Sequence, residues 1–165
     1  MNSASTNREL TDSESTNRQL IERFYGAFAQ RDAATMAACY RSDATFRDPA
    51  FELRGSDVGK MWKMLCSRGA DLRIEFANVT AQGERGSVDW QAWYTFSSTG
   101  HPVHNIIHAD FRFSDGLIAE HVDTFDFWRW SRQALGTAGL LLGWSPYLQG
   151  KVRAQAAKAL HSYSE

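Results

Sequence analysis

The amino-acid sequence predicts an α+β protein with three N-terminal helices, then a curved antiparallel sheet, then a helical extension. Apolar residues recur at helical spacing as far as about Ser67. From Leu72 they alternate along four segments separated by Gly-containing turns, which is typical of antiparallel strands. Helical spacing returns after Trp128. The 165 residues suit one folded domain over 17–128, with a leader over 1–16 and an extension over 129–165.

The composition favours a packed interior with an apolar pocket and argues against nucleic acid as a partner. Hydrophobic residues make up 43% of the chain and aromatic residues 13%, which supplies large rings for core and pocket alike. The net charge of −1 provides no basic field for a polyphosphate. Cys39 and Cys66 fall in apolar helical contexts, where reduced thiols are expected, so we expect a cytoplasmic protein.

The leader over 1–16 is rich in Ser, Thr and Asn and has almost no apolar side chains. Such a composition does not repay the entropy lost on ordering, so we expect disorder there. The leader also lacks the apolar run of a signal peptide or a membrane span, and we expect no membrane partner.

Three helices are expected after the leader, over 17–31, 33–40 and 58–67. Their apolar residues recur at helical spacing: Leu20, Ile21, Phe24, Tyr25 and Phe28 in the first, Met36, Ala37, Cys39 and Tyr40 in the second, and Met61, Trp62, Met64 and Leu65 in the third.

Two short strands are expected before the third helix, over 44–48 and 51–54. Pro49 lacks a backbone donor, so regular pairing ends at Asp48. A side chain at such a strand end is often directed into a cavity, where desolvation raises the pKa of a carboxyl group and makes it a proton acceptor near neutral pH. The alternative is that Asp48 caps the turn before Pro49.

Four long strands are expected over 72–81, 87–97, 103–113 and 117–127. Alternation assigns the third strand two faces, with Asn105, Ile107, Ala109, Phe111 and Phe113 on one and His104, Ile106, His108, Asp110 and Arg112 on the other. Two His residues four positions apart in a strand are separated by roughly 13 Å, too far to hold one metal ion together. We therefore expect no metal site and an exposed or dimer-forming face.

The last strand carries the main indication of function. His121, Asp123, Phe125 and Phe127 alternate onto one face. Ionisable groups in line with aromatic rings indicate a cavity wall rather than a packed core or a solvated surface. A hydrogen bond between His121 and Asp123 would orient the imidazole and provide a base. The alternative is that this face is exposed or buried in a dimer.

The extension begins with helical spacing that ends at Gly136. The apolar run GLLLGW over 139–144 is too short to cross a bilayer, so we expect a lid or a contact surface. A last helix is expected over 147–163, with Leu148, Val152, Ala156, Ala159 and Leu160 facing inward and Lys151, Arg153 and Lys158 outward.

The order of these elements, with the motifs ATFRDP at 44–49 and DGLIAEHVDTFD at 115–126, resembles the nuclear transport factor 2 superfamily in its SnoaL-like and ketosteroid-isomerase-like branch. The likeness covers about residues 20–127. It implies a cone-shaped α+β fold, and the superfamily includes ketosteroid isomerases, SnoaL-like polyketide cyclases and limonene epoxide hydrolases.

Carried over by position, the resemblance places Asp48 at the general base of the ketosteroid isomerases. It places Phe24 and Ala109 where those enzymes have their oxyanion-hole donors, a Tyr and a protonated acid, so both donors are absent in register. Tyr25 and Asp110 lie next to these positions, but a shift of one residue in a strand moves a side chain to the opposite face. Steroid isomerisation by that mechanism is therefore not expected.

We expect a small-molecule pocket protein with cofactor-independent acid/base chemistry of the isomerase, cyclase or hydrolase type. Its substrate would be a small apolar carbonyl-like or epoxide-like compound, and Asp48, His121 and Asp123 would be catalytic. The predicted substrate-binding residues are Phe24, Tyr25, Trp62, Trp90, Tyr94, Asn105, Ala109 and Phe125. A homodimer is expected. The alternative is a noncatalytic ligand-binding and dimerisation module of the same fold.

Overall fold

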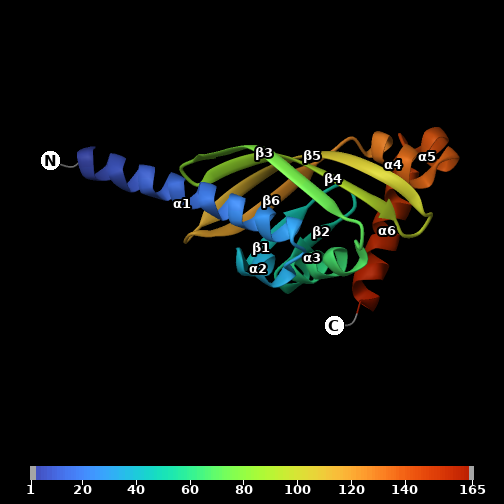
Figure 1. Ribbon diagram of the computed structural model, residues 1–165, viewed down its shortest axis with the longest axis horizontal. Helices are drawn as coiled ribbons and strands as arrows, with labels where there is room; N and C mark the ends of the chain where they lie inside the picture. Colours follow the sequence, from blue (N-terminus) through green and yellow to red (C-terminus); the bar gives the residue numbers. More distant parts are fainter. Residues whose placement is uncertain (1–2, 164–165) are drawn as a thin grey trace.

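The structure is a computed structural model that describes residues 3–163. Helices α1 (Ser3–Ala29), α2 (Ala33–Ala38) and α3 (Ser56–Arg68) lie against one face of a curved sheet, and the C-terminal helices lie at one end of it (Figure 1). The predicted α+β class is confirmed.

The sheet has six strands in the order β2-β1-β6-β5-β4-β3. The strands are β1 (Tyr40–Arg47), β2 (Glu52–Arg54), β3 (Arg73–Gln82), β4 (Arg85–Phe96), β5 (His101–Ser114) and β6 (Leu117–Thr124). The long strands β3 to β6 form the predicted antiparallel meander. Strand β1 differs because it pairs with β6 in parallel, and the sequence pattern gives no indication of that pairing.

The predicted disordered leader is not observed, because α1 is helical from Ser3 onward. The end of the leader is held by the β3–β4 hairpin: Glu14 accepts a hydrogen bond from the Gly83 amide at 3.0 Å, and Asn17 donates to the Gly83 carbonyl at 2.9 Å. Composition does not reveal partners so distant in sequence. Met1 and Asn2 lie outside the described residues, and the division into three segments stays a prediction.

The second helix ends at Ala38, so Tyr40 lies in β1 rather than in a helix. Its place is fixed by pairing with Ile118 of β6. A register shift between Tyr40 and Thr45 breaks the alternation of buried and exposed residues, which is why the sequence pattern did not extend the strand to Tyr40.

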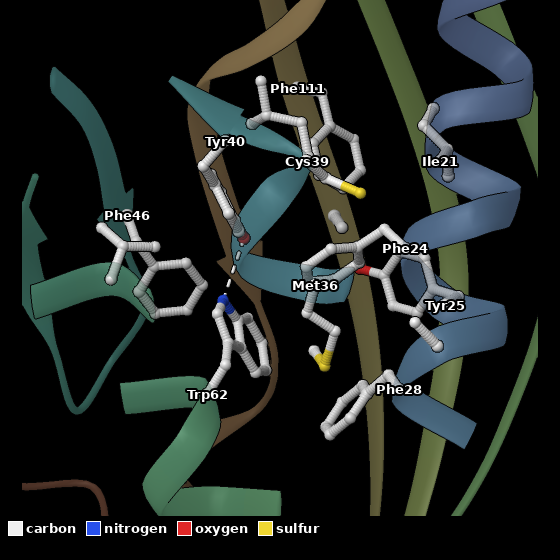
Figure 2. Close-up of a cluster of buried hydrophobic side chains, with 14 of the residues drawn as sticks. Ile21, Phe24, Tyr25, Phe28, Met36, Cys39, Tyr40, Phe46, Trp62 and Phe111 are labelled. Atoms are coloured by element: carbon white, nitrogen blue, oxygen red, sulfur yellow. Dashed lines mark hydrogen bonds between the residues drawn. The ribbon is translucent and has the colours of Figure 1, made fainter. Parts of the chain in front are cut away.

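Aromatic rings from α1 and α3 fill the space beneath the sheet (Figure 2). The ring of Trp62 lies 5.4 Å from that of Phe24 and 5.1 Å from that of Phe28, both edge to face. The predicted faces of β5 are confirmed, since Ala109 is fully buried whereas Ile106 is 49% exposed. The buried face of the sheet is therefore the one that carries His121 and Asp123.

The extension folds as α4 (Phe127–Leu135), α5 (Thr137–Leu142) and α6 (Pro146–Ser162). Helix α4 adds a second apolar cluster around Val103 and Trp130. Helix α6 reaches back to the turn after β1, where Arg153 and Gln149 donate to the Pro49 carbonyl at 2.9 and 3.3 Å. Between residues 3 and 163, none of the helices has the length and apolar character needed to cross a bilayer.

Helix α1 lies so close to β4 that position 86 requires glycine. A Cβ atom added to Gly86 would lie 2.8 Å from the Thr80 carbonyl oxygen and 2.9 Å from side-chain carbons of both Ile21 and Phe113. The backbone oxygen has no freedom to rotate away, so any larger residue forces the helix or the hairpin to shift.

We predict that Gly86→Ala lowers the free energy of unfolding by about 1–3 kcal/mol through overpacking. The matched control is Gly26→Ala in α1, where an added Cβ meets nothing within 4 Å and helix propensity predicts a gain of up to about 1 kcal/mol. Urea denaturation of both variants measures the difference. Equal stabilities would show that α1 does not press on β4 as described.

Candidate active site

A chain of hydrogen-bonded side chains runs through the apolar interior. The Tyr40 hydroxyl lies 2.6 Å from Nδ1 of His121, and Nε2 of His121 lies 2.9 Å from Oδ1 of Asp123. Each end receives an indole N–H: Trp62 Nε1 donates to the Tyr40 hydroxyl at 3.0 Å (Figure 2), and Trp90 Nε1 donates to Asp123 Oδ1 at 3.3 Å. The predicted contact between His121 and Asp123 is present.

One arrangement of protons satisfies the whole chain. Because Trp62 occupies an acceptor position of the Tyr40 oxygen, the Tyr40 O–H is free to donate to Nδ1 of His121. Nε2 then carries the imidazole proton and donates it to the Asp123 carboxylate. The chain thereby fixes the orientation of His121 and places a hydrogen-bond donor on Asp123.

His121 itself is sealed from solvent. Its side chain is 0% exposed, and the rings around it include Phe111 at 4.3 Å, Phe46 at 5.0 Å and Phe24 at 5.7 Å between centroids. No substrate reaches the imidazole without moving these rings. His121 is therefore suited to positioning Asp123 rather than to contacting a substrate.

Asp123 is buried beside Ala109, its partner in register on β5. The small Ala109 side chain leaves room for the indole of Trp90, which comes from β4 and crosses β5 to reach the carboxylate. Ala109 is the position at which the ketosteroid isomerases have their protonated acid, and in this protein the Trp90 indole lies beside it. The hydrogen bonds from Trp90 and His121 both go to Oδ1 of Asp123, and within residues 13–163 no side chain or backbone group donates to its Oδ2.

Asp48 follows the last residue of β1 and lies in the same part of the interior as Asp123. The parallel register pairs Phe46 with His121 and Arg47 with Val122, and Asp48 is near enough for the charge of Asp123 to act on its carboxyl group. Oδ1 of Asp48 accepts the amides of Ala50 and Phe51 at 2.7 and 2.6 Å. The turn-capping role that was the alternative for Asp48 is therefore observed, and it occupies only one of the two oxygens.

Burial raises the pKa of Asp48 to about 7, and the negative charge of Asp123 acts in the same direction. The amides of Phe51 and Ala50 and the nearby cation of Arg153 oppose the shift without cancelling it. Asp48 as a residue keeps some exposed surface, but its carboxyl group lies deep enough for desolvation to dominate. A carboxyl group with this pKa accepts and donates protons at neutral pH.

Tyr25 contributes the one buried side-chain polar atom without a hydrogen-bond partner among the described residues, its hydroxyl oxygen. Burial raises the pKa of Tyr25 well above its ordinary value, and the charges of Asp123 and Tyr40 add to the effect. The hydroxyl therefore stays protonated close to the hydrogen-bonded chain. An unpartnered buried O–H is costly, and it is ready to donate to a water or a ligand oxygen.

The other predicted binding residues divide into core and rim. Phe24, Trp62 and Ala109 are fully or almost fully buried in the core. Tyr94 and Phe125 are half-buried and lie where the two apolar clusters meet.

The rim residues also connect the site to the extension. The Tyr94 hydroxyl accepts a hydrogen bond from Trp130 of α4 at 2.8 Å. Asp48 lies close enough for its charge to raise the pKa of Tyr94, which burial brings to about 12. Asn105 lies on the same inner face with 8% of its surface exposed. Tyr94 therefore links the neighbourhood of Asp48 with α4.

Sequence reasoning missed Tyr40 as a site residue. Its position looked like the apolar end of a helix, and only the parallel pairing with β6 turns its hydroxyl toward His121. A Tyr followed by the polar pair Ser42 and Asp43 was the available signal that the helix had already ended.

The polar side chains of the outer face have partners of their own, and a hollow there reaches as far as Phe125. His108 contacts Asp89 at 2.6 Å and His104 contacts Gln91 at 2.7 Å, so each has its own partner. A hollow of about 640 Å³ on this face is lined by Glu75, Asp89, Ile106, His108 and Asp126, among others.

A second hollow, of about 710 Å³, lies between α2 and α3 beside Tyr163. Neither hollow is lined by Asp48, His121 or Asp123. Within residues 3–163, no cluster of three or more His, Cys, Asp or Glu side chains is arranged to hold a metal ion.

We predict that Tyr40→Phe lowers the free energy of unfolding by about 1–3 kcal/mol for each buried group that it leaves unpaired, namely Trp62 Nε1 and His121 Nδ1. The matched control is Tyr25→Phe, which removes an equally buried hydroxyl that has no partner and is expected to leave stability equal or higher. Thermal or urea unfolding of the two variants compares them. A Tyr40 variant as stable as the Tyr25 variant would contradict the hydrogen-bonded chain.

Comparison with known proteins agrees with this fold. The family model described as the SnoaL-like domain matches residues 21–121. No curated protein matches the sequence.

Three solved structures illustrate the likeness. An LEH-like epoxide hydrolase from M. tuberculosis has 19% identity and a TM-score of 0.61, covering 78% of this chain and 94% of its own. A candidate polyketide cyclase from Xanthomonas campestris pv. campestris has 17% identity and a TM-score of 0.63, with coverages of 74% and 98%. A protein with a ketosteroid isomerase-like fold from Catenulispora acidiphila, crystallised with trimethylamine, has 12% identity and a TM-score of 0.63, with coverages of 77% and 97%. Identities this low establish a shared fold and not a shared substrate.

Proposed function

The chain belongs to the SnoaL-like domain family, and we propose that it carries out cofactor-independent acid/base chemistry on a small apolar carbonyl-like or epoxide-like compound. The observation that carries the proposal is the pair of carboxyl groups, Asp48 and Asp123, in an apolar interior, near enough for the charge of Asp123 to act on Asp48. One of them has a pKa of about 7, and the other is held by a hydrogen-bonded histidine.

In this proposal Asp48 is the catalytic base. Its Oδ1 is held by the turn, which leaves Oδ2 to take a proton from an acidic C–H or from an attacking water. The same carboxyl group then returns the proton to the substrate carbon or oxygen. The pKa near 7 suits both directions, because the acid and the base form are present together at neutral pH.

Asp123, His121 and Tyr25 have supporting roles. Asp123 lies near Asp48 and orients the reacting proton, and His121 with Tyr40 fixes the position of its carboxyl group. The Tyr25 hydroxyl is as deeply buried as His121 and has no hydrogen-bond partner, so it donates to the substrate oxygen on which negative charge develops only when the surrounding rings move to admit the substrate. The surrounding rings give the site its preference for an apolar compound.

The relatives support this class of chemistry without fixing the reaction. The structures that share the fold include an LEH-like epoxide hydrolase and a candidate polyketide cyclase. Epoxide opening and aldol-type cyclisation both require one group that removes a proton and one that delivers a proton. Asp48 meets that requirement in either case, because a carboxyl group with a pKa of about 7 takes up a proton and then returns it.

A noncatalytic binding module of the same fold is the second candidate. The observation that favours it is the enclosure of His121 by aromatic rings, together with the absence of Asp48 and Asp123 from both hollows described above. In that case the interior holds a ligand without changing it. The homodimer and the cytoplasmic location stay predictions under either function.

The test is turnover of defined probes by the full chain. Small cyclic epoxides in ¹⁸O-labelled water report hydrolysis, and ketones in D₂O report proton exchange beside the carbonyl. We expect Asp48→Asn to lower kcat/KM by about 100-fold or more. Asp89→Asn, a carboxylate on the outer face that contacts His108, is the matched control and should leave it unchanged.

The pH dependence of kcat/KM tests whether Asp48 acts in its ionised form. Since the ionised form of Asp48 is the base, kcat/KM should rise with pH and level off above about 7. Unchanged turnover in both Asp48→Asn and Asp123→Asn would remove the two residues from the mechanism. Tight binding of a probe seen by native mass spectrometry, with no turnover of any probe by the wild-type chain, would favour the noncatalytic module.

A further inference from the structure

The C-terminal helices present an exposed apolar surface at one end of the molecule, here called the C-terminal tip. It comprises Trp128, Leu140, Leu141, Leu142, Trp144 and Tyr147, which are 41%, 50%, 67%, 43%, 72% and 63% exposed. Helices α4 and α5 lie at the end of the molecule opposite the N-terminus (Figure 1). Single exposed apolar residues are ordinary, but a contiguous group of six marks an interaction surface.

The tip is exposed because α5 packs through its glycines. A Cβ atom at Gly139 would lie 1.9 Å from the Ser131 carbonyl oxygen, and one at Gly143 would lie 2.0 Å from the Ser131 hydroxyl oxygen. This close contact with α4 turns the three leucines outward. An ordinary surface helix buries its leucines and exposes its small or polar residues, so the orientation of α5 is the reverse of the usual one.

The polar atoms of the two tip indoles are already satisfied within the protein. Trp128 Nε1 donates to the Leu140 carbonyl at 3.3 Å, and Trp144 Nε1 donates to the Leu141 carbonyl at 2.9 Å. These bonds also hold the rings in place. The exposed atoms of these rings are therefore mainly carbon. An apolar environment can cover them without leaving an indole N–H group unpaired.

Basic residues outnumber acidic ones in the C-terminal helices. From Phe127 to Tyr163 the sequence has five basic residues, Arg129, Arg132, Lys151, Arg153 and Lys158, and neither Asp nor Glu; the acidic residue beside the tip is Asp126, which caps α4. Two of the cations lie against tip rings, Arg132 at 4.3 Å from the Trp128 ring and Lys151 at 4.8 Å from the Tyr147 ring. A binding partner must therefore combine an apolar region with negative charge.

We propose that the C-terminal tip docks peripherally on an anionic phospholipid surface. The leucines and the Trp144 ring enter the boundary between headgroups and acyl chains, and Arg132 and Lys151 remain beside the acidic headgroups. Trp and Tyr favour this boundary because one side of each ring is apolar and the other tolerates water. The proposal extends beyond the acid/base site and does not depend on it.

A second copy of the chain fits the tip less well than lipid does. Symmetric pairing of two tips would bring like-charged Arg132 and Lys151 side chains of the two copies to one interface, with only Asp126 as an acidic residue beside the tip to offset them. An anionic lipid surface supplies the opposite charge over the whole tip.

The experiment is co-sedimentation of the full chain with phosphatidylcholine vesicles, with and without phosphatidylserine. We expect binding to the phosphatidylserine vesicles that weakens with added salt. The variant Leu141→Ser with Trp144→Ser should reduce binding at least about tenfold, since it removes two inserted side chains. Its control is Ile106→Ser, an exposed apolar residue on the outer face of the sheet, which should bind like the wild type.

The contribution of positive charge to vesicle binding is tested by two double variants that each remove two positive charges. Arg132→Gln with Lys151→Gln should reduce binding about tenfold or more, whereas Arg47→Gln with Arg54→Gln, which removes equal charge from exposed residues of β1 and β2, should leave it unchanged. Circular dichroism confirms that each variant is folded. The proposal fails if the wild type does not bind phosphatidylserine vesicles or if the tip variants bind equally well. It also fails if sedimentation shows that the tip variants only separate a dimer into monomers.

Discussion

The parallel pairing of β1 with β6 is the constraint on which the site depends. At its start, pairing of Tyr40 with Ile118 directs the Tyr40 hydroxyl to His121. At its end, β1 leads directly into Asp48, whose carboxyl group is near enough to Asp123 to be affected by its charge. One backbone pairing thus positions both the hydrogen-bonded chain and the second carboxyl group, and a shift of one residue would turn every one of these side chains to the opposite face.

The interior tolerates these polar groups because nearly all of them have partners. A lone carboxylate among aromatic rings would be strongly disfavoured, but Asp123 accepts from both His121 and Trp90, and Tyr40 joins His121 to Trp62. Asp48 gains only the turn amides, and burial raises its pKa to about 7 despite them. The contrast between the two carboxyl groups is what makes the pair suitable for moving protons.

Features that depend on local pattern could be predicted from the sequence, and features that depend on distant contacts could not. Alternation placed His121 and Asp123 on the inner face, and helical spacing placed Trp62 in the core. The register shift in β1 concealed Tyr40, because it breaks the period on which a strand prediction rests. The link from Trp90 to Asp123 depends on the order of three strands, which no local pattern reveals.

The most direct test of the account is a carboxyl ¹³C NMR titration of Asp48 in the wild type and in Asp123→Asn. The account predicts a pKa of about 7 in the wild type and a lower value in the variant, because the neighbouring negative charge is gone while burial remains. A pKa near the ordinary value of about 4 in both proteins would contradict the buried carboxyl pair.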